Sequence, residues 1–249
     1  MRASSRQRCL TVSQLEWSPQ RLDALNRLTT VARLLSTAIH ETGNSLQIIS
    51  GNAEMLEARP GDADRTRTRA QDIRNHADRA GARLRALIAL ATAPAGPPRR
   101  LDLSALTERA LDLRRYTLRR AQVKVEVIVH DPVDVSGDET ILIRLLANLL
   151  LTAEAAIAGQ PGARIQLHIT RMGNRGVLIV EHNGPAITAD QVNTLFEPFA
   201  DADAPDGGLA AARWLATSQG GTLEVDTNRD EGIAVRLELP AVERASNGV

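Results

Sequence analysis

An apolar stripe with a seven-residue period runs through residues 19–58, and this stripe constrains the fold more than any other feature. Its members are Leu28, Leu35, Thr42, Ile49 and Leu56, with Leu25, Leu46 and Ala53 close beside it. A spacing of seven residues returns side chains to one face of an α-helix. The pattern therefore predicts one long helix over 19–58 that packs against another helix.

A second helix is expected over 64–92, after a turn at 59–63 that contains Pro60 and Gly61. Both residues oppose continuation of a helix, so the two helices form a hairpin. One hairpin offers too little surface to bury both apolar stripes, whereas two identical hairpins close a four-helix bundle. We therefore expect a homodimer that assembles through the hairpin.

The remainder of the chain predicts an α+β domain, because helical and alternating patterns follow one another after the proline-rich segment 93–100. Helices are expected at 104–120, 138–158 and 208–218, and strands at 123–129, 164–171, 176–182, 222–227 and 232–239. The expected fold class is α+β multidomain, a dimeric helical hairpin followed by an α/β sandwich. The expected divisions are an extension (1–18), the hairpin (19–92), a linker (93–100), the second domain (101–241) and a tail (242–249).

Charge and composition exclude several classes of function. Thirty basic residues balance thirty acidic ones, so the positive field typical of nucleic-acid binding is missing. No apolar run is long enough for direct membrane insertion, and we expect a cytoplasmic protein. Cys9 is the only cysteine and no Cys/His cluster has zinc-ligand spacing, which predicts no structural metal. Lys124 is the only lysine and lies outside any P-loop motif.

His40 is the candidate for covalent chemistry. Glu41 follows it and Asn44 lies one helical turn further, so the imidazole and the amide share a face. A neutral imidazole nitrogen can attack phosphorus, a neighbouring carboxylate can hold its tautomer, and Asn44 can position a water for loss of phosphate. An isolated His-Glu pair is more often just a polar part of an exposed helix face.

The segment 38–56, AIHETGNSLQIISGNAEML, resembles the H-box of HisKA-type histidine kinases. This resemblance implies that His40 carries a phosphoryl group and exchanges it with an aspartate of a response-regulator receiver domain. Ser45 replaces the usual proline, so the helix bend expected there is absent or weaker.

Residues 101–240 resemble the ATP-binding domain of the same kinases, the Bergerat or GHKL fold, in a degenerate form. The resemblance implies that Asn148, in the N-box at 137–156, ligates Mg²⁺. Thr152 replaces the second N-box asparagine. In the G1 box at 180–187, which includes Gly184, His182 replaces the aspartate that accepts a hydrogen bond from the adenine amino group; a neutral imidazole can accept one such bond.

The glycine-rich phosphate loop is also altered. Only its last glycine, Gly208, remains, because Ala204 and Asp206 occupy the positions of the first two. Asp201 and Asp203 add further negative charge to the same segment, and this charge opposes the phosphates. Binding of Mg-ATP is therefore doubtful.

Three functions remain open at this stage. The first is phosphoryl exchange between His40 and a receiver domain with a weak or absent ATP-dependent step. The second is an active ATP-dependent sensor histidine kinase, and the third is a non-enzymatic dimeric scaffold. ATP binding separates the second from the others, and phosphoryl transfer at His40 separates the first from the third.

Overall fold

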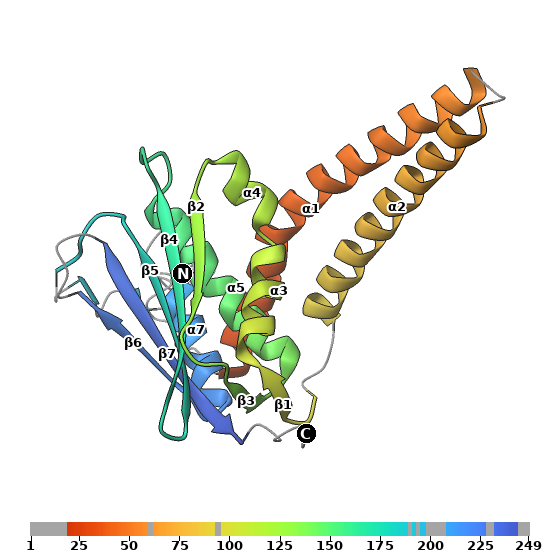
Figure 1. Ribbon diagram of the computed structural model, residues 1–249. Coiled ribbons are helices and arrows are strands. Elements are labelled where there is room, and N and C mark those ends of the chain that lie inside the picture. The colour runs from red at the N-terminus through yellow and green to blue at the C-terminus, as the bar shows by residue number, and fades with distance from the viewer. Residues whose placement is uncertain are drawn as a thin grey trace, which may run out of the picture.

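The computed structural model describes residues 19–58, 62–92, 96–188, 191–192, 195–197, 208–227 and 232–243. A helical hairpin, α1 (Pro19–Ala58) and α2 (Ala63–Thr92), projects from an α/β domain (Figure 1). The fold class expected from the sequence is confirmed for the single chain. Among the described residues, no helix is both long enough and apolar enough to cross a membrane.

In the described part of the α/β domain, a seven-stranded sheet packs with four helices. The helices are α3 (Leu103–Asp112), α4 (Arg115–Arg120), α5 (Glu139–Ala156) and α7 (Gly208–Ser218). The strands are β1 (Arg99–Asp102), β2 (Lys124–Val129), β3 (Asp134–Gly137), β4 (Arg164–Met172), β5 (Arg175–His182), β6 (Thr222–Asp226) and β7 (Ile233–Val242). The strand order is β1-β3-β7-β5-β4-β2, and β6 pairs with β7.

The helices cover one face of the sheet, as Figure 1 shows. Burial along β4 alternates: Ile165, Leu167 and Ile169 are fully buried, whereas the residues between them are partly exposed. Such alternation is typical of a strand with a core on one side only. β2 and β4 run parallel, and the other neighbouring pairs are antiparallel.

Helix α5 lies at the centre of the core. Asp138 caps its N-terminus by accepting a 2.9 Å hydrogen bond from the amide of Ile141. Apolar residues lie all round the helix, because it packs against the sheet, α3, α7 and α1 together. Its polar residues are therefore brought into closely packed surroundings.

Helix α1 uses different faces for the domain and for solvent. The buried face steps by three or four residues and consists of Asn26, Thr30, Leu34, Ala38, Glu41 and Ser45. The N-terminal half of α1 lies against α5 and α7, and the C-terminal half runs with α2 into the projecting arm (Figure 1). Leu28 and Leu35 of the heptad stripe are 68% and 42% exposed in the single chain, and Leu46 beside the stripe is 57% exposed.

Two sequence expectations about secondary structure were wrong. The helix expected at 104–120 is divided into α3 and α4 by a turn at Leu113 and Arg114, where the Arg114 side chain reaches into the interior. The sequence did not predict the strands β1 and β3. Each has only four residues, too few to display an alternating pattern. The residues Asp201, Asp203, Ala204 and Asp206 of the expected phosphate-loop segment lie outside the described residues.

Candidate functional site

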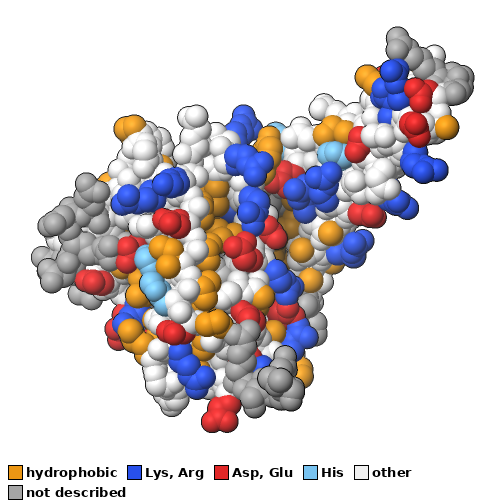
Figure 2. Space-filling view, viewed as in Figure 1, with side chains coloured by type: hydrophobic (Ala, Val, Ile, Leu, Met, Phe, Trp, Pro, Cys, Tyr) orange, Lys and Arg blue, Asp and Glu red, His pale blue; other side chains and the backbone are white. Residues whose placement is uncertain are grey.

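His40 lies on the exposed surface of α1, where the hairpin leaves the α/β domain. The helix continues unbroken through Ser45, so no helix end interrupts the segment around the imidazole. Figure 2 shows basic side chains along the projecting arm. Helix α2 contains seven arginines and three aspartates. The surroundings of His40 are thus accessible and carry excess positive charge on the neighbouring helix.

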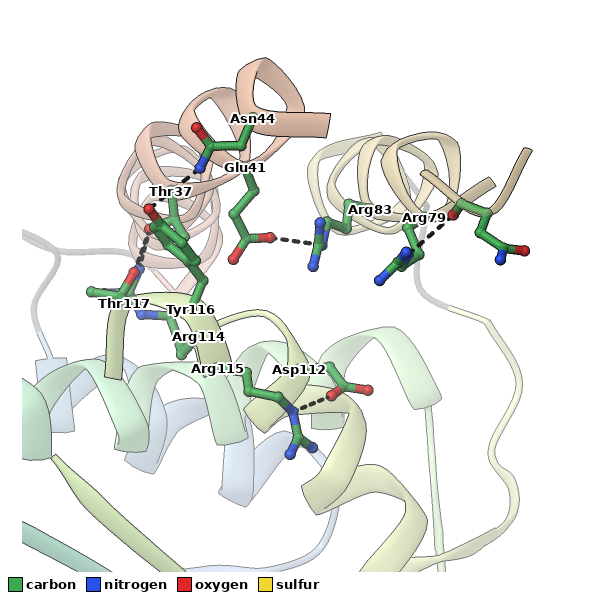
Figure 3. A network of polar contacts seen from close by, with 11 residues as sticks. Thr37, Glu41, Asn44, Arg79, Arg83, Asp112, Arg114, Arg115, Tyr116 and Thr117 are labelled. Carbon is green, nitrogen blue, oxygen red and sulfur yellow. Dashed lines mark hydrogen bonds and ion pairs between the residues drawn. The ribbon is translucent and has the colours of Figure 1, made fainter. Parts of the chain in front are cut away.

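Glu41 is turned away from solvent and toward α2. Its side chain is 6% exposed, and its Oε2 atom lies 2.6 Å from Nε of Arg83 (Figure 3). Burial raises the pKa of the Glu41 carboxyl, and the positive charges of Arg83 and Arg114 oppose that rise. The expectation that this carboxylate flanks the imidazole needs correction, because the ion pair holds it in the interface of the hairpin.

Asn44 is exposed and is held by the α/β domain. Its Nδ2 atom donates a hydrogen bond of 3.3 Å to the hydroxyl oxygen of Tyr116 on α4 (Figure 3). One turn before His40, the hydroxyl oxygens of Thr37 and Thr117 lie 2.9 Å apart. These contacts fix the face of α1 that carries His40 and Asn44 relative to α4.

Arg114 joins three helices beneath this face. Its Nη1 atom donates to Thr37 on α1 at 2.9 Å (Figure 3). Its Nε atom donates to Glu154 on α5 at 2.9 Å. A second bond of 2.5 Å joins Nη2 of Arg114 to Oε2 of Glu154, which makes the pair bidentate. Both side chains are largely buried, at 8% and 13% exposure. A largely buried ion pair within the α/β domain therefore fixes the guanidinium group that donates to Thr37 of the hairpin.

Asn148, expected at the magnesium position, is completely buried under α1. Its amide oxygen accepts a 2.8 Å hydrogen bond from the hydroxyl of Thr30. Its amide nitrogen donates a 3.1 Å hydrogen bond to Oδ1 of Asn26. Both ends of the amide are thus engaged by the first half of the hairpin helix.

Thr152 makes a local contact within α5. Its hydroxyl donates to the backbone oxygen of Asn148, one turn earlier, at 2.9 Å. This back-bond is common for threonine in helices, and it directs the hydroxyl along the helix. In this arrangement Thr152 does not extend outward as a substitute for an asparagine side chain.

His182, at the end of β5, presents a donor where an acceptor was expected. Its Nδ1 atom accepts a 3.1 Å hydrogen bond from the amide of Gly184. Burial lowers the pKa of the imidazole, which favours the neutral form. Since Nδ1 accepts, the ring proton belongs on Nε2, and Nε2 has no hydrogen-bond partner among the described residues. The accepting nitrogen of His182 that was considered for adenine recognition is therefore already bonded to the amide of Gly184.

The two candidate glycines allow close backbone packing. A Cβ atom at Gly184 would lie 2.9 Å from the backbone oxygen of Ala156 and 2.9 Å from Nδ1 of His182. Gly208 begins α7 with a φ of +36°, which L side chains rarely adopt, and it is buried. Both positions therefore need glycine to maintain the packing of this domain.

Mg-ATP does not fit these residues in the observed arrangement. The only oxygen of the Asn148 side chain is shielded from solvent by α1, and a metal ion would have to displace Thr30 to reach it. The Nε2–H group of His182 and the amino group of adenine are both donors, so they cannot bond to each other. His40, by contrast, remains accessible.

Sequence reasoning missed the residues that dock the hairpin on the α/β domain, namely Asn26, Thr30, Thr37, Arg114 and Tyr116. It also missed Arg83, which pairs with Glu41 inside the hairpin. The polar residues Asn26, Thr30 and Thr37 interrupt the apolar pattern of α1 on one side of the helix. That interruption was the available signal for a polar contact. The partners on α4 and α5 lie about 80 to 120 positions away and have no local motif.

Comparison with known families matches residues 137–243 to the family described as histidine kinase-, DNA gyrase B-, and HSP90-like ATPases. The match begins at the end of β3 and includes α5, β4, β5, α7, β6 and β7. It therefore covers the part of the chain that contains Asn148 and His182.

Individual relatives extend the similarity to the hairpin. The sensor histidine kinase ZraS of Escherichia coli (strain K12) is 26% identical over 217 residues, which cover 86% of this chain and 46% of ZraS. This chain thus spans about half the length of that relative.

Solved structures share the fold. The mycobacterial sensor histidine kinase MprB aligns with a TM-score of 0.52 at 26% identity, covering 59% of this chain and 99% of that chain. Histidine kinase ThkA, in complex with the response regulator protein TrrA, aligns with a TM-score of 0.52 at 20% identity. That alignment covers 87% of this chain and 63% of the other chain.

Proposed function

We propose that this chain is a two-component signalling protein. The premise is that residues 137–243 form a domain of the histidine kinase-like ATPase family, joined to a kinase-type helical hairpin. His40 exchanges a phosphoryl group with an aspartate of a response-regulator receiver domain, and the chain's own ATP-dependent step is weak or absent. One observation carries the proposal: His40 is exposed while Asn148 is buried beneath α1.

The chemistry at His40 needs an accessible, neutral imidazole nitrogen. Its lone pair attacks the phosphorus of the receiver's aspartyl phosphate, an N–P bond forms, and the acyl phosphate P–O bond breaks. The aspartate leaves as a carboxylate, and the imidazole loses its other ring proton to solvent. Asn44, fixed by Tyr116 on the same face, is placed to orient a water molecule near the phosphoryl group. The receiver's own acidic pocket supplies Mg²⁺.

The charge of the hairpin surface favours docking of a receiver domain with an acidic surface. The excess of arginine on α2 favours an acidic partner surface, because opposite charges accelerate encounter and select the orientation of docking. The complex of ThkA with TrrA is a precedent within the same fold for a regulator on such a core. We propose that the receiver docks on the arm around His40.

The same arm supplies a homodimer interface. Large apolar side chains are exposed on both helices of the hairpin, and these include Leu28, Ile39, Leu46, Leu84 and Ile88. Exposed apolar side chains on both helices of a hairpin are typical of a helix bundle that is completed by a second copy. Dimerisation buries this stripe and leaves the His40 face accessible.

An active autokinase is the second candidate, and the family match at 137–243 favours it. In this alternative, α1 leaves α5, Asn148 becomes available to Mg²⁺ and ATP phosphorylates His40. Acid-labile labelling of the purified chain distinguishes the candidates, with His40→Gln as the test variant. His76→Gln is the matched control, since His76 lies on the same hairpin.

Label should reach the wild type and His76→Gln from a phosphorylated receiver, and it should be lost in His40→Gln. Strong labelling from γ-labelled ATP alone would replace the proposal with the autokinase. No label by either route would leave the non-enzymatic scaffold.

A further inference from the structure

The first half of α1 forms a polar contact with α5 that is buried from solvent. Asn26 and Thr30 lie one helical turn apart and meet the Asn148 amide with complementary donors and acceptors. The three residues are 3%, 0% and 0% exposed. Buried polar groups are costly unless they are satisfied, and here each end of the Asn148 amide has a partner on α1.

The surrounding packing extends this contact along the helix. Arg33 Nη2 donates to the backbone oxygen of Leu151 on α5 at 3.4 Å. Leu34, the next residue, is 1% exposed and belongs to the same hydrophobic core as the apolar residues of α5. One face of residues 26–34, with Asn26, Thr30 and Leu34, is therefore part of the domain's interior in this conformation.

We infer that residues 26–34 of α1 act as an internal cap, which must leave α5 before a magnesium-bound nucleotide can reach Asn148. The inference rests on the proposed function only in taking Asn148 as the nucleotide-facing residue of the ATPase-type domain. The cap competes with the ligand, so the measured affinity equals the intrinsic affinity multiplied by the fraction of molecules in which α1 is released.

The cap and the phosphoacceptor lie on one continuous helix. Ten residues separate Thr30 from His40, a rise of about 15 Å along α1. A rotation or shift of α1 that withdraws Thr30 from Asn148 also moves His40 relative to α4. Access to the nucleotide face and the position of His40 are thereby coupled.

Binding of a fluorescent ATP analogue with Mg²⁺, followed by anisotropy on the full chain, tests the cap. The double variant Asn26→Ala/Thr30→Ala removes both hydrogen bonds to Asn148. Thr29→Ala is the matched control, because among the described residues the Thr29 hydroxyl donates to backbone oxygens of α1 itself, those of Leu25 and Asn26.

Each lost hydrogen bond should tighten binding about 5-fold, and the double variant should gain about 25-fold over the wild type. Thr29→Ala should bind like the wild type. Adding Asn148→Ala to the double variant should abolish the gain. If circular dichroism finds the double variant unfolded, Thr30→Ala alone provides the test through its smaller gain.

The inference would be overturned if the wild type and the folded cap variants bound the nucleotide with equal affinity. It would also be overturned if none of them bound it detectably. Transfer from a phosphorylated receiver to His40, measured on the same proteins, tests the proposed function separately. Gain of nucleotide binding without receiver transfer would support the cap and reject the phosphotransfer function.

Discussion

The hydroxyl of Thr30 on α1 lies 2.8 Å from the amide oxygen of Asn148 on α5, although 118 positions separate the two residues in the chain. This contact connects the two functional parts of the protein, the hairpin that carries His40 and the domain related to ATPases. The buried amide of Asn148 therefore keeps its hydrogen bonds only while α1 stays packed against α5.

Replacing Arg114 should destabilise the folded chain, because Glu154 would keep a largely buried charge without its partner. For Arg114→Met we expect the free energy of unfolding to fall by about 3 kcal/mol. Urea denaturation followed by circular dichroism measures this change. Arg115→Met is the control: Arg115 pairs with Asp112 at more than half exposure on both sides, and its loss should cost less than about 0.5 kcal/mol. Equal effects of the two variants would contradict this assignment.

Glu41 should act in positioning the hairpin, because its carboxylate is paired with Arg83. We expect Glu41→Gln to lower the rate of phosphoryl transfer at His40 by less than about 10-fold, whereas a general base typically contributes about 100-fold or more. Single-turnover transfer from a phosphorylated receiver measures the rate, and His40→Gln defines the zero level. A loss of 100-fold or more in Glu41→Gln would assign the carboxylate a direct role.

Stability should decrease below about pH 6.5 through His182. Burial lowers the pKa of this imidazole in the folded chain, so the unfolded chain binds the proton more readily. The stabilising contribution is complete above the ordinary histidine pKa and is lost as pH falls toward the folded value. The slope approaches about 1.4 kcal/mol per pH unit.

Unfolding experiments at several pH values between 5 and 7.5, on the wild type and His182→Gln, measure this dependence. Glutamine has no titrating group, so the difference in unfolding free energy between the two proteins should change with pH only below about 6.5. A difference that stays constant with pH would exclude His182 as the source.

The exposed apolar residues along the heptad stripe of α1 and beside it should control dimerisation. Leu46 is 57% exposed in the single chain, and a charge placed there would be buried in the proposed interface. We expect Leu46→Glu to weaken the dimer at least about 10-fold in sedimentation velocity experiments. Gln47→Glu adds the same charge at the next exposed position and should leave the dimer intact. Dissociation by both variants alike would indicate a general effect of charge.

Several parts of the fold were accessible from the sequence because they depend on local patterns. The period of the apolar residues predicted α1 over Pro19–Ala58, and the alternation around Val125 and Val127 predicted β2. The break between α3 and α4 was missed, because Leu113 and Arg114 include neither glycine nor proline. Arg114 turns there to pair with Glu154, and such a long-range interaction has no local signature.

By itself, the sequence determined the fold class, the long helix with His40 and the likeness of the second domain to histidine kinases, since periodicity and motifs are properties of neighbouring residues. Only the tertiary structure decided that Glu41 faces Arg83, that His182 uses its accepting nitrogen on Gly184 and that Thr30 covers Asn148. The physical reason is that an amide, a carboxylate or an imidazole can bind several partners, and packing alone determines which partner lies within hydrogen-bonding distance.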